Sequence, residues 1–315
     1  MVSLRDMFGG AAAGSFLGVA EAAQDAPEGD IVIFGADCAT PYASVGAYCA
    51  GGPAAVRVGT AAYAGHPGKY NFDIGGPVIP DGVRVVDLGD LPVDAEAAEA
   101  NRSMIRTVTE RVLQAGGVPV LLGGDDSLPT PMLMAYGGRE PLHILQIDAH
   151  IDWRDSVEGE RWGLSSTMRR ASEMDHVAGI VQVGQRGIGS ASATEVAAAR
   201  AWGACLVPAR EIDSGGITRA IEAVPVGADV VICLDWDALD PAIMPAVIAP
   251  TAGGLSYREL MALVGGVAAR ARIAGLAMVE FMPEADREGA GALTAGQAAA
   301  SLVGMIAQQR ARAPR

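Results

Sequence analysis

Basic residues are scarce in this chain of 315 residues. Lysine and arginine together number 23, whereas aspartate and glutamate number 37, so the formal net charge at pH 7 is -14. A protein that binds nucleic acid or an anionic lipid surface usually gathers positive charge on one face. The composition therefore predicts no nucleic-acid partner and no membrane partner. The acidic field suits a cationic ligand, or it serves only solubility.

Cysteines and long uncharged apolar runs are also few. The four cysteines show no CxxC spacing and are typical of ordinary thiols in a reducing compartment, so we expect a cytoplasmic protein. We find no charge-free segment of 18 or more apolar residues and predict no transmembrane helix. Residues 1–23 imitate a secretory signal, but Asp6 beside Arg5 and a content of glycine and alanine rather than leucine argue against one.

Short apolar runs do alternate with amphipathic segments along the whole chain. Near-continuous apolar strands that alternate with helices predict an α/β protein with three layers, in which a mostly parallel sheet is covered by helices on both faces. We find no repeat or low-complexity linker and expect a single domain over residues 1–315. The predicted strands are 30–36, 83–90, 118–124, 143–149, 180–187, 205–211, 229–237 and 274–283, and the predicted helices are 97–117, 193–203, 217–224, 256–272 and 295–313.

The long glycine-rich segment 41–78 has neither pattern. We expect it to be an ordered cover over a site rather than a disordered linker, because long loops in compact domains are usually functional.

Acidic residues gather where four predicted strands end. In open parallel sheets, ligands bind beyond the carboxyl ends of the strands. A single acid there is usually a helix cap or a turn former, but seven or eight together repel one another and cannot all stay ionised without a cation. The set predicts a bound divalent metal; it comprises Asp125, Asp126, Asp148, Asp152, Asp235, Asp237, Asp240 and Glu280, with His150 among them.

The spacing within these clusters favours two ions. Asp148, His150 and Asp152 occupy alternate positions and point to one side if the chain is extended, as do Asp235 and Asp237. A carboxylate can bridge two metals, and two ions about 4 Å apart can hold a hydroxide that is nucleophilic at neutral pH.

Three separated motifs resemble those of the ureohydrolases, the arginase and agmatinase family: "GGDDS", "DAHID" and "LDWDALDPAIMPA". The segments 46–57 ("GAYCAGGPAAVR") and 279–286 ("VEFMPEAD") are similar to two further segments of that family. The resemblance implies a three-layer α/β fold, a pair of divalent metal ions, and hydrolysis of a guanidino group to urea by the metal-bridging hydroxide. It also implies homo-trimers or hexamers. Manganese is the expected metal, and nickel is the alternative.

The resemblance also implies roles for individual residues. Asp148 and Asp235 would bridge both metals, Asp152 would complete the first site, and His150 with Asp237 would complete the second. Glu280 resembles the acid that pairs with the substrate guanidinium; its alternative role is a structural salt bridge at a strand end. The predicted metal ligands are Asp126, Asp148, His150, Asp152, Asp235 and Asp237, and the predicted catalytic residues are Asp148, His150 and Glu280.

Two departures from the family pattern leave two functions open. Asp126 stands where the family has a metal-binding histidine, so five carboxylates would face the four positive charges of two ions, and bound water would be acidified less. The stretch 160–174 lacks the histidine that many members use as a proton shuttle. The chain is then either an active amidinohydrolase with an aspartate-rich site or a weakened homologue. The latter would be a structural or regulatory subunit of a hetero-oligomeric guanidine or biguanide hydrolase, assembled with an active paralogue.

Substrate choice is not reported by the motifs. The acidic chain and Glu280 suit a cationic guanidino compound, and we find no motif for an α-amino-acid clamp, so an agmatine-like or small alkylguanidine is preferred over arginine.

His66 is a candidate surrogate base, with an exposed loop histidine as the alternative. Trp153, Trp162 and Trp236 flank the motifs and either wall a pocket for the cation or pack in the core.

Overall fold

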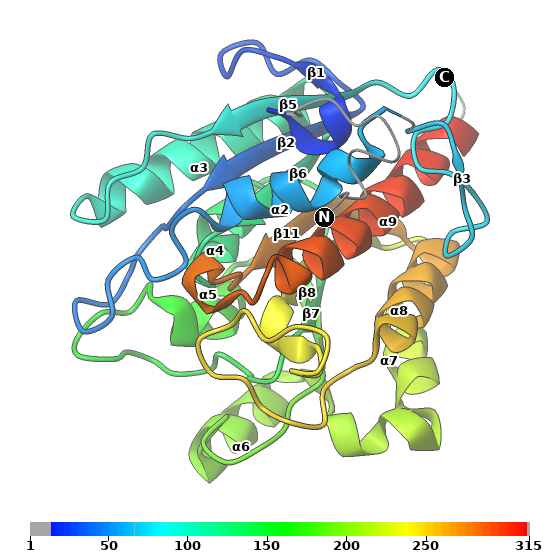
Figure 1. The fold of residues 1–315 in the computed structure, drawn as a ribbon. Helices are drawn as coiled ribbons and strands as arrows, with labels where there is room; N and C mark the ends of the chain where they lie inside the picture. The colour runs from blue at the N-terminus through cyan, green and yellow to red at the C-terminus, as the bar shows by residue number, and fades with distance from the viewer. Residues whose placement is uncertain (1–13, 66, 314–315) are drawn as a thin grey trace.

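A nine-stranded parallel sheet forms the centre of the protein (Figure 1). The structure is a computed structural model and describes residues 14–65 and 67–313. The strand order is β1-β5-β2-β6-β11-β10-β7-β8-β9, and every pair within this sheet is parallel. The strands are β1 (Ala20–Glu21), β2 (Ile31–Ala36), β5 (Val85–Asp90), β6 (Val118–Gly123), β7 (Leu142–Ile147), β8 (Val177–Val183), β9 (Cys205–Val207), β10 (Asp229–Asp235) and β11 (Arg272–Val279).

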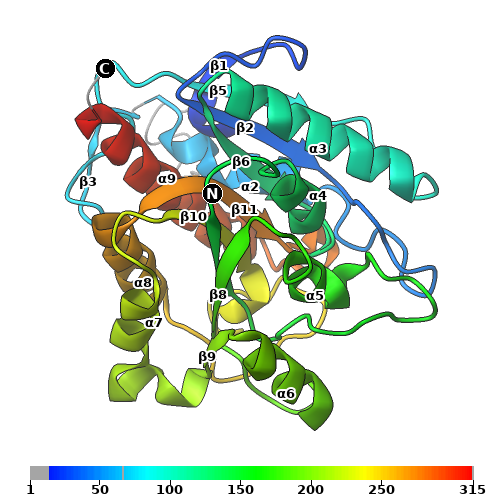
Figure 2. The ribbon, with the colours of Figure 1, turned by 180° about the vertical axis from the view of Figure 1, so that it is seen from behind.

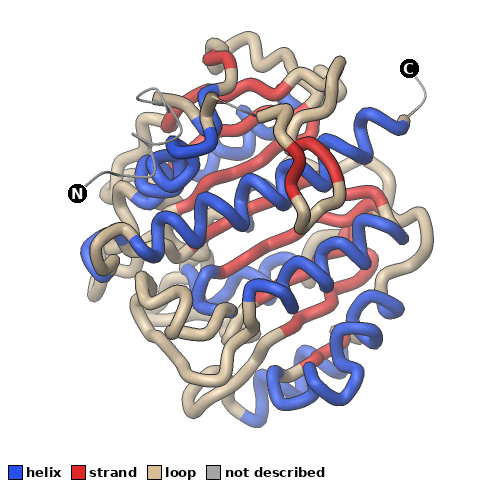
Figure 3. The backbone as a smooth tube through the Cα atoms, turned by 45° about the vertical axis from the view of Figure 1, so that its right-hand side comes forward, coloured by secondary structure: helices blue, strands red, loops and turns tan. Residues whose placement is uncertain are grey.

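Helices cover both faces of the sheet, which confirms the three-layer prediction (Figures 1 and 2). One apolar core lies between the sheet and α2 (Gly52–Thr60), α7 (Ile217–Ala223), α8 (Tyr257–Arg270) and α9 (Ala290–Arg312). A second core lies beneath α3 (Ala98–Gln114), α4 (Pro129–Met134), α5 (Thr167–Ala171) and α6 (Ala193–Trp202). Figure 3 shows the strands of this nine-stranded sheet as one layer with helices in front and behind. Burial on both faces explains why β2 and β6 are apolar at successive positions rather than at alternate ones.

The predicted elements recur with small shifts of their ends. Helix α3 ends at Gln114, and Gly116 follows with a φ of 81°, a left-handed conformation that glycine adopts without steric cost. Helix α9 begins at Ala290, five residues before the predicted start. By length and composition α9 could cross a membrane, but 78% of its most apolar window is buried inside the fold, where it packs on α2, α8 and β11.

The segment 41–78 differs from the expected continuous cover. It contains α2 and a small antiparallel pair, β3 (Tyr70–Asn71) and β4 (Gly76–Pro77). Among its described residues, Tyr48 in the part before α2 contacts Glu280 of the acidic cluster. Helix α2 begins at Gly52, where a Cβ atom would lie 2.8 Å from the carbonyl oxygen of Phe281, so the missing side chain lets α2 approach the end of β11. His66 and residues 1–13, the first part of the signal-like segment 1–23, lie outside the described residues.

Candidate metal centre

Four neighbouring strands bring the predicted acids together. Strands β6, β11, β10 and β7 are adjacent in the sheet, and because they are parallel their carboxyl ends share one edge. Two groups of side chains have ligand atoms within 4.8 Å of one another: Asp148 with His150 and Asp237, and Asp126 with Asp148 and Asp152. Asp148 belongs to both groups, which is the arrangement that a carboxylate shared by two cations requires.

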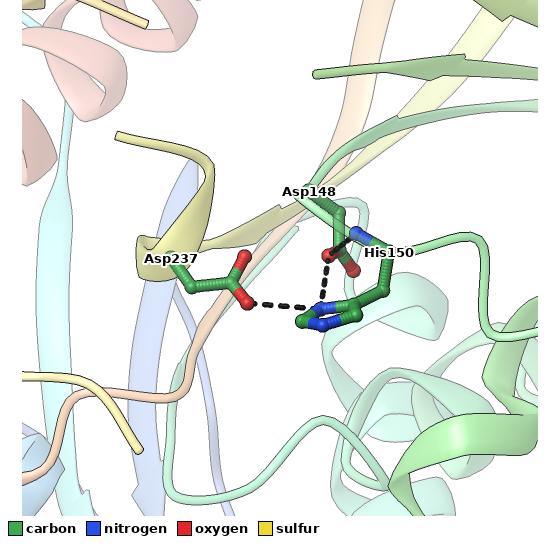
Figure 4. A group of neighbouring side chains, drawn as sticks. All are labelled: Asp148, His150 and Asp237. Carbon is green, nitrogen blue, oxygen red and sulfur yellow. Dashed lines mark hydrogen bonds and ion pairs between the residues drawn. The ribbon is translucent and has the colours of Figure 1, made fainter. Parts of the chain in front are cut away.

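His150 lies between two carboxylates (Figure 4). Its Nδ1 is 2.9 Å from Oδ2 of Asp237 and 3.3 Å from Oδ1 of Asp148, and its backbone N–H donates to the same Asp148 oxygen at 2.6 Å. Burial alone would lower the pKa of His150, but its hydrogen bonds to Asp148 and Asp237 raise that pKa to about 11. Burial opposes ionisation of Asp148 as well, and the hydrogen bond from His150 outweighs it and lowers the pKa of Asp148.

A buried glutamine on strand β7, Gln146, holds the second group of ligands. The side-chain amide of Gln146 donates to Oδ2 of Asp148 at 2.7 Å and to Oδ2 of Asp152. Gln182, its neighbour on β8, donates to the Gln146 carbonyl oxygen and to the backbone carbonyl of Ile151. The motifs did not identify Gln146. The signal for it was a polar residue within the apolar strand 143–149, two positions before Asp148.

Asp235 and two other acids are placed differently. Asp235 is buried and accepts a hydrogen bond from the Asp237 backbone at 2.7 Å, but it belongs to neither compact group. Asp240 accepts hydrogen bonds from the backbones of Ala242 and Gly253, so it stabilises a turn and lies outside both groups. Asp125 accepts from Ser127 behind the site and is likewise outside them.

Backbone strain marks two of the site residues. Asp152 has a φ of 44° and Glu280 a φ of 69°, both in the left-handed region that residues with a Cβ seldom adopt. Such strain persists where the surrounding structure holds it, and it is concentrated at functional sites.

The donor set fits divalent cations. Burial, followed by repulsion from neighbouring carboxylates, raises the pKa of Asp126, Asp152, Asp235 and Asp237. Oδ2 of Asp126 is buried without a hydrogen-bond partner among the described residues. Both observations describe carboxylates that need positive charge, and a set of oxygen ligands with one imidazole suits manganese or another hard divalent ion.

Glu280 is held by neutral donors. The Tyr48 hydroxyl donates to its Oε1 and Oε2 at 2.6 and 2.8 Å, and the Asp126 backbone donates to Oε1 at 2.8 Å. Burial raises the pKa of Glu280 to about 8. Among the described residues no basic side chain forms a salt bridge with Glu280. Its alternative role, a structural salt bridge at a strand end, therefore has no partner among them. Tyr48 was not predicted, because its partner is 232 positions away in the sequence.

A cavity of about 160 Å³ opens over the centre. It is lined by Leu164 and Ser165, which belong to the stretch 160–174 that lacks a histidine. The pair Arg154 and Glu195 lies at its wall with 3.9 Å between Nε and Oε1. Of the three tryptophans only Trp153 lines this cavity. Trp236 is fully buried, and the Trp162 ring stacks under the Arg102 guanidinium at 5.5 Å.

Arg186 joins two loops beside the cavity. Its guanidinium donates to the backbone carbonyls of Asp237 at 2.6 Å and of Thr251 at 2.7 Å. It thereby ties the loop after β8 to the segment after β10, which carries Asp237. The glycine-rich segment 184–190 contains this arginine, but only the fold showed what it contacts.

A parallel three-layer α/β fold with paired carboxylate clusters at the strand ends defines a metal-dependent hydrolase of the ureohydrolase class. Residues 29–304 match the arginase family, and the chain belongs to that family. The family depends on a binuclear metal centre, and the two ligand groups that share Asp148 could hold such a pair of ions in this chain.

Several ureohydrolases are similar to this chain. The chain is 34% identical to the N(1)-aminopropylagmatine ureohydrolase of Thermus thermophilus over 207 residues, which cover 65% of this chain and 68% of that protein. It is 26% identical to the agmatinase of Pyrococcus horikoshii over 289 residues, covering 90% and 94%. Among solved structures, proclavaminate amidino hydrolase from Streptomyces clavuligerus superposes with a TM-score of 0.81 at 26% identity, covering 93% of this chain and 97% of that one.

Proposed function

We propose that this protein hydrolyses a cationic guanidino compound and releases urea, with two divalent ions held at the carboxyl edge of the sheet. The observation that carries this proposal is the position of Asp148, which belongs to both ligand groups beneath a cavity that Glu280 also lines. The names of the relatives, which include agmatinase and guanidinopropionase, support the same class of substrate.

Each residue has a separate task in this proposal. Asp126, Asp148 and Asp152 would hold one ion, and Asp148, His150 and Asp237 would hold the other. Asp235, which lies outside both compact groups, would be a further ligand. When bound, the ions supply a water molecule that is deprotonated near neutral pH and a Lewis acid for the guanidino group. Glu280 accepts hydrogen bonds from the guanidinium and fixes its orientation over the centre. Gln146 orients Asp148 and Asp152.

The cavity favours a small substrate. Its volume of about 160 Å³ is well below the range of about 300–1,000 Å³ that is usual for drug-sized ligands. Trp153 borders the cavity but is only 3% exposed and packs in the apolar core against Trp202, so it offers a cation little aromatic surface. The small volume supports an agmatine-like or small alkylguanidine.

We infer manganese as the metal, with nickel as the alternative, and a homo-trimer or hexamer as the assembly. The second candidate function is that of a weakly active or inactive subunit that assembles with an active paralogue in the cytoplasm. Asp126 at the position of a family histidine favours this alternative, because a fifth carboxylate lowers the positive charge of the centre.

One experiment separates the two candidates. The protein is purified alone after growth with manganese and nickel, its metal content per subunit is measured by elemental analysis, and urea release is assayed with a panel of guanidines. Two metals with urea release would support the hydrolase. One metal or none, with no urea from any guanidine, would contradict it and favour the non-catalytic subunit.

A further inference from the structure

Tyr48 contacts the carboxylate that we assign to the substrate guanidinium. Its hydroxyl oxygen is 2.6 Å from Oε1 and 2.8 Å from Oε2 of Glu280, so one O–H donor is shared between both oxygens. A donor at nearly equal distances from the two oxygens lies in front of the carboxylate, close to the line that bisects it.

A guanidinium uses that same position. It binds a carboxylate best through two parallel N–H donors, one to each oxygen. The remaining acceptor positions of Glu280 are also partly taken, because the Asp126 N–H donates to Oε1 at 2.8 Å and the Cys49 sulfur is 3.8 Å from Oε2. Glu280 therefore cannot hold Tyr48 and a bidentate guanidinium together.

The contact comes from outside the cavity. Glu280 lines the cavity over the metal centre, whereas Tyr48 is not among the described residues that line it. The hydroxyl thus occupies the front of the carboxylate, where both oxygens can be reached at once, although Tyr48 does not itself line the cavity. Presenting both oxygens to the cavity requires the Tyr48–Glu280 bond to break.

Two glycines flank Tyr48 in the sequence and set the course of its loop. Gly46 and Gly51, on either side of it, have φ values of 64° and 80°, which glycine adopts without the strain that a Cβ would bring. Beyond Gly51, the chain is anchored by the close packing of Gly52 on the backbone of Phe281. Tyr48 itself is partly exposed, whereas the neighbouring Cys49 is fully buried.

We propose that Tyr48 is a specificity-determining residue that competes with the substrate for the two oxygens of Glu280. A ligand with two parallel N–H donors replaces the single O–H with a stronger pair of bonds, whereas a simple ammonium gains less. Tyr48 then favours guanidinium and amidinium groups over amines. This inference rests on the proposed function in assigning the guanidinium to Glu280.

The test removes only the hydroxyl. The variant Tyr48→Phe, in the metal-loaded full chain, is titrated with guanidinium chloride and with methylammonium chloride by calorimetry, and the KM of the best guanidine is measured. We expect guanidinium to bind about tenfold more tightly or better, because a hydrogen bond to a charged acceptor no longer has to be broken. KM should fall more than kcat changes, and the preference over methylammonium should shrink.

Controls keep the outcome clear. Tyr70→Phe, at a side chain that is 60% exposed and distant from Glu280 in the fold, should change none of these values. Tyr48→Leu should reproduce the gain if Tyr48→Phe does not fold. Unchanged or weaker guanidinium binding in a folded Tyr48 variant would overturn the inference.

The binding measurement needs no turnover. A protein that releases no urea, but whose Tyr48→Phe variant binds guanidinium more tightly, would contradict the proposed hydrolysis and still support the role of Tyr48.

Discussion

Removal of the Asp148 carboxylate is the most direct test of the metal centre. Asp148 belongs to both ligand groups, so Asp148→Ala should lower the affinity of both ions, whereas loss of a ligand to one ion would affect mainly that one. In metal-free protein the variant loses hydrogen bonds from Gln146 and His150, each worth about 1.5–3 kcal/mol, but it also relieves repulsion on Asp152 and Asp126. These effects oppose each other, and we expect the net change to stay below about 3 kcal/mol.

The larger effect appears when metal is present. With free metal at a hundred times its Kd, each site adds about 2.7 kcal/mol to the stability of the native protein, so two sites add about 5 kcal/mol. For a chain of 315 residues this raises Tm by about 8 °C, since the entropy of unfolding is about 2.1 cal/mol/K per residue. The Asp148→Ala variant should show neither the bound metal nor this increase in Tm.

The assay compares Tm by circular dichroism in manganese and in chelator, together with elemental analysis of dialysed protein. Asp213→Ala is the matched control, because that aspartate is exposed on the π-helical turn Ile212–Gly216 before α7 and should leave both measurements unchanged. If Asp148→Ala retained two metals and the full metal-dependent rise in Tm, the assignment of the whole site would be refuted.

Three further predictions concern the same centre. Gln146→Leu removes the amide that orients Asp148 and Asp152, so it should weaken metal binding about 10–100-fold. Competition with a metal indicator measures this affinity, and an unchanged affinity would show that the contact is dispensable. Asp126→His removes one negative charge, so the pH profile of urea release should shift to lower pH, and an unshifted profile would contradict the charge argument. Metal-free protein should lose stability between pH 5 and pH 8 in denaturant titrations. Burial raises the pKa of Glu280 from 4.5 to about 8, so the folded state keeps a proton that the unfolded chain releases; constant or rising stability would contradict this.

The order of apolar runs and acidic motifs was enough to predict much of this protein. Continuous apolar strands such as 118–124 and 229–237 indicated a sheet buried on both faces, and that is the environment they occupy. The same reasoning placed Asp126, Asp148 and Asp237 near one another, because parallel strands end at one edge. The weaker predictions concerned the segment 41–78 and Asp240. Their local sequences suit a cover or a ligand as well as the helix, hairpin and turn that they form.

The residues that only the tertiary structure could identify are those whose partners are distant in the sequence. Tyr48 lies in a glycine-rich loop, and nothing nearby indicates Glu280, which follows a strand formed near the other end of the chain. The role of Gln146 depends on the hydrogen bond from Gln182 on the neighbouring strand and on the backbone bend that places Asp152 near it. Periodicity and motif spacing report local conformation and the end of the sheet at which a side chain emerges. Hydrogen bonds between such side chains depend on which strands are neighbours. In this protein the neighbours are set by the order β6-β11-β10-β7, which exists only in the assembled sheet.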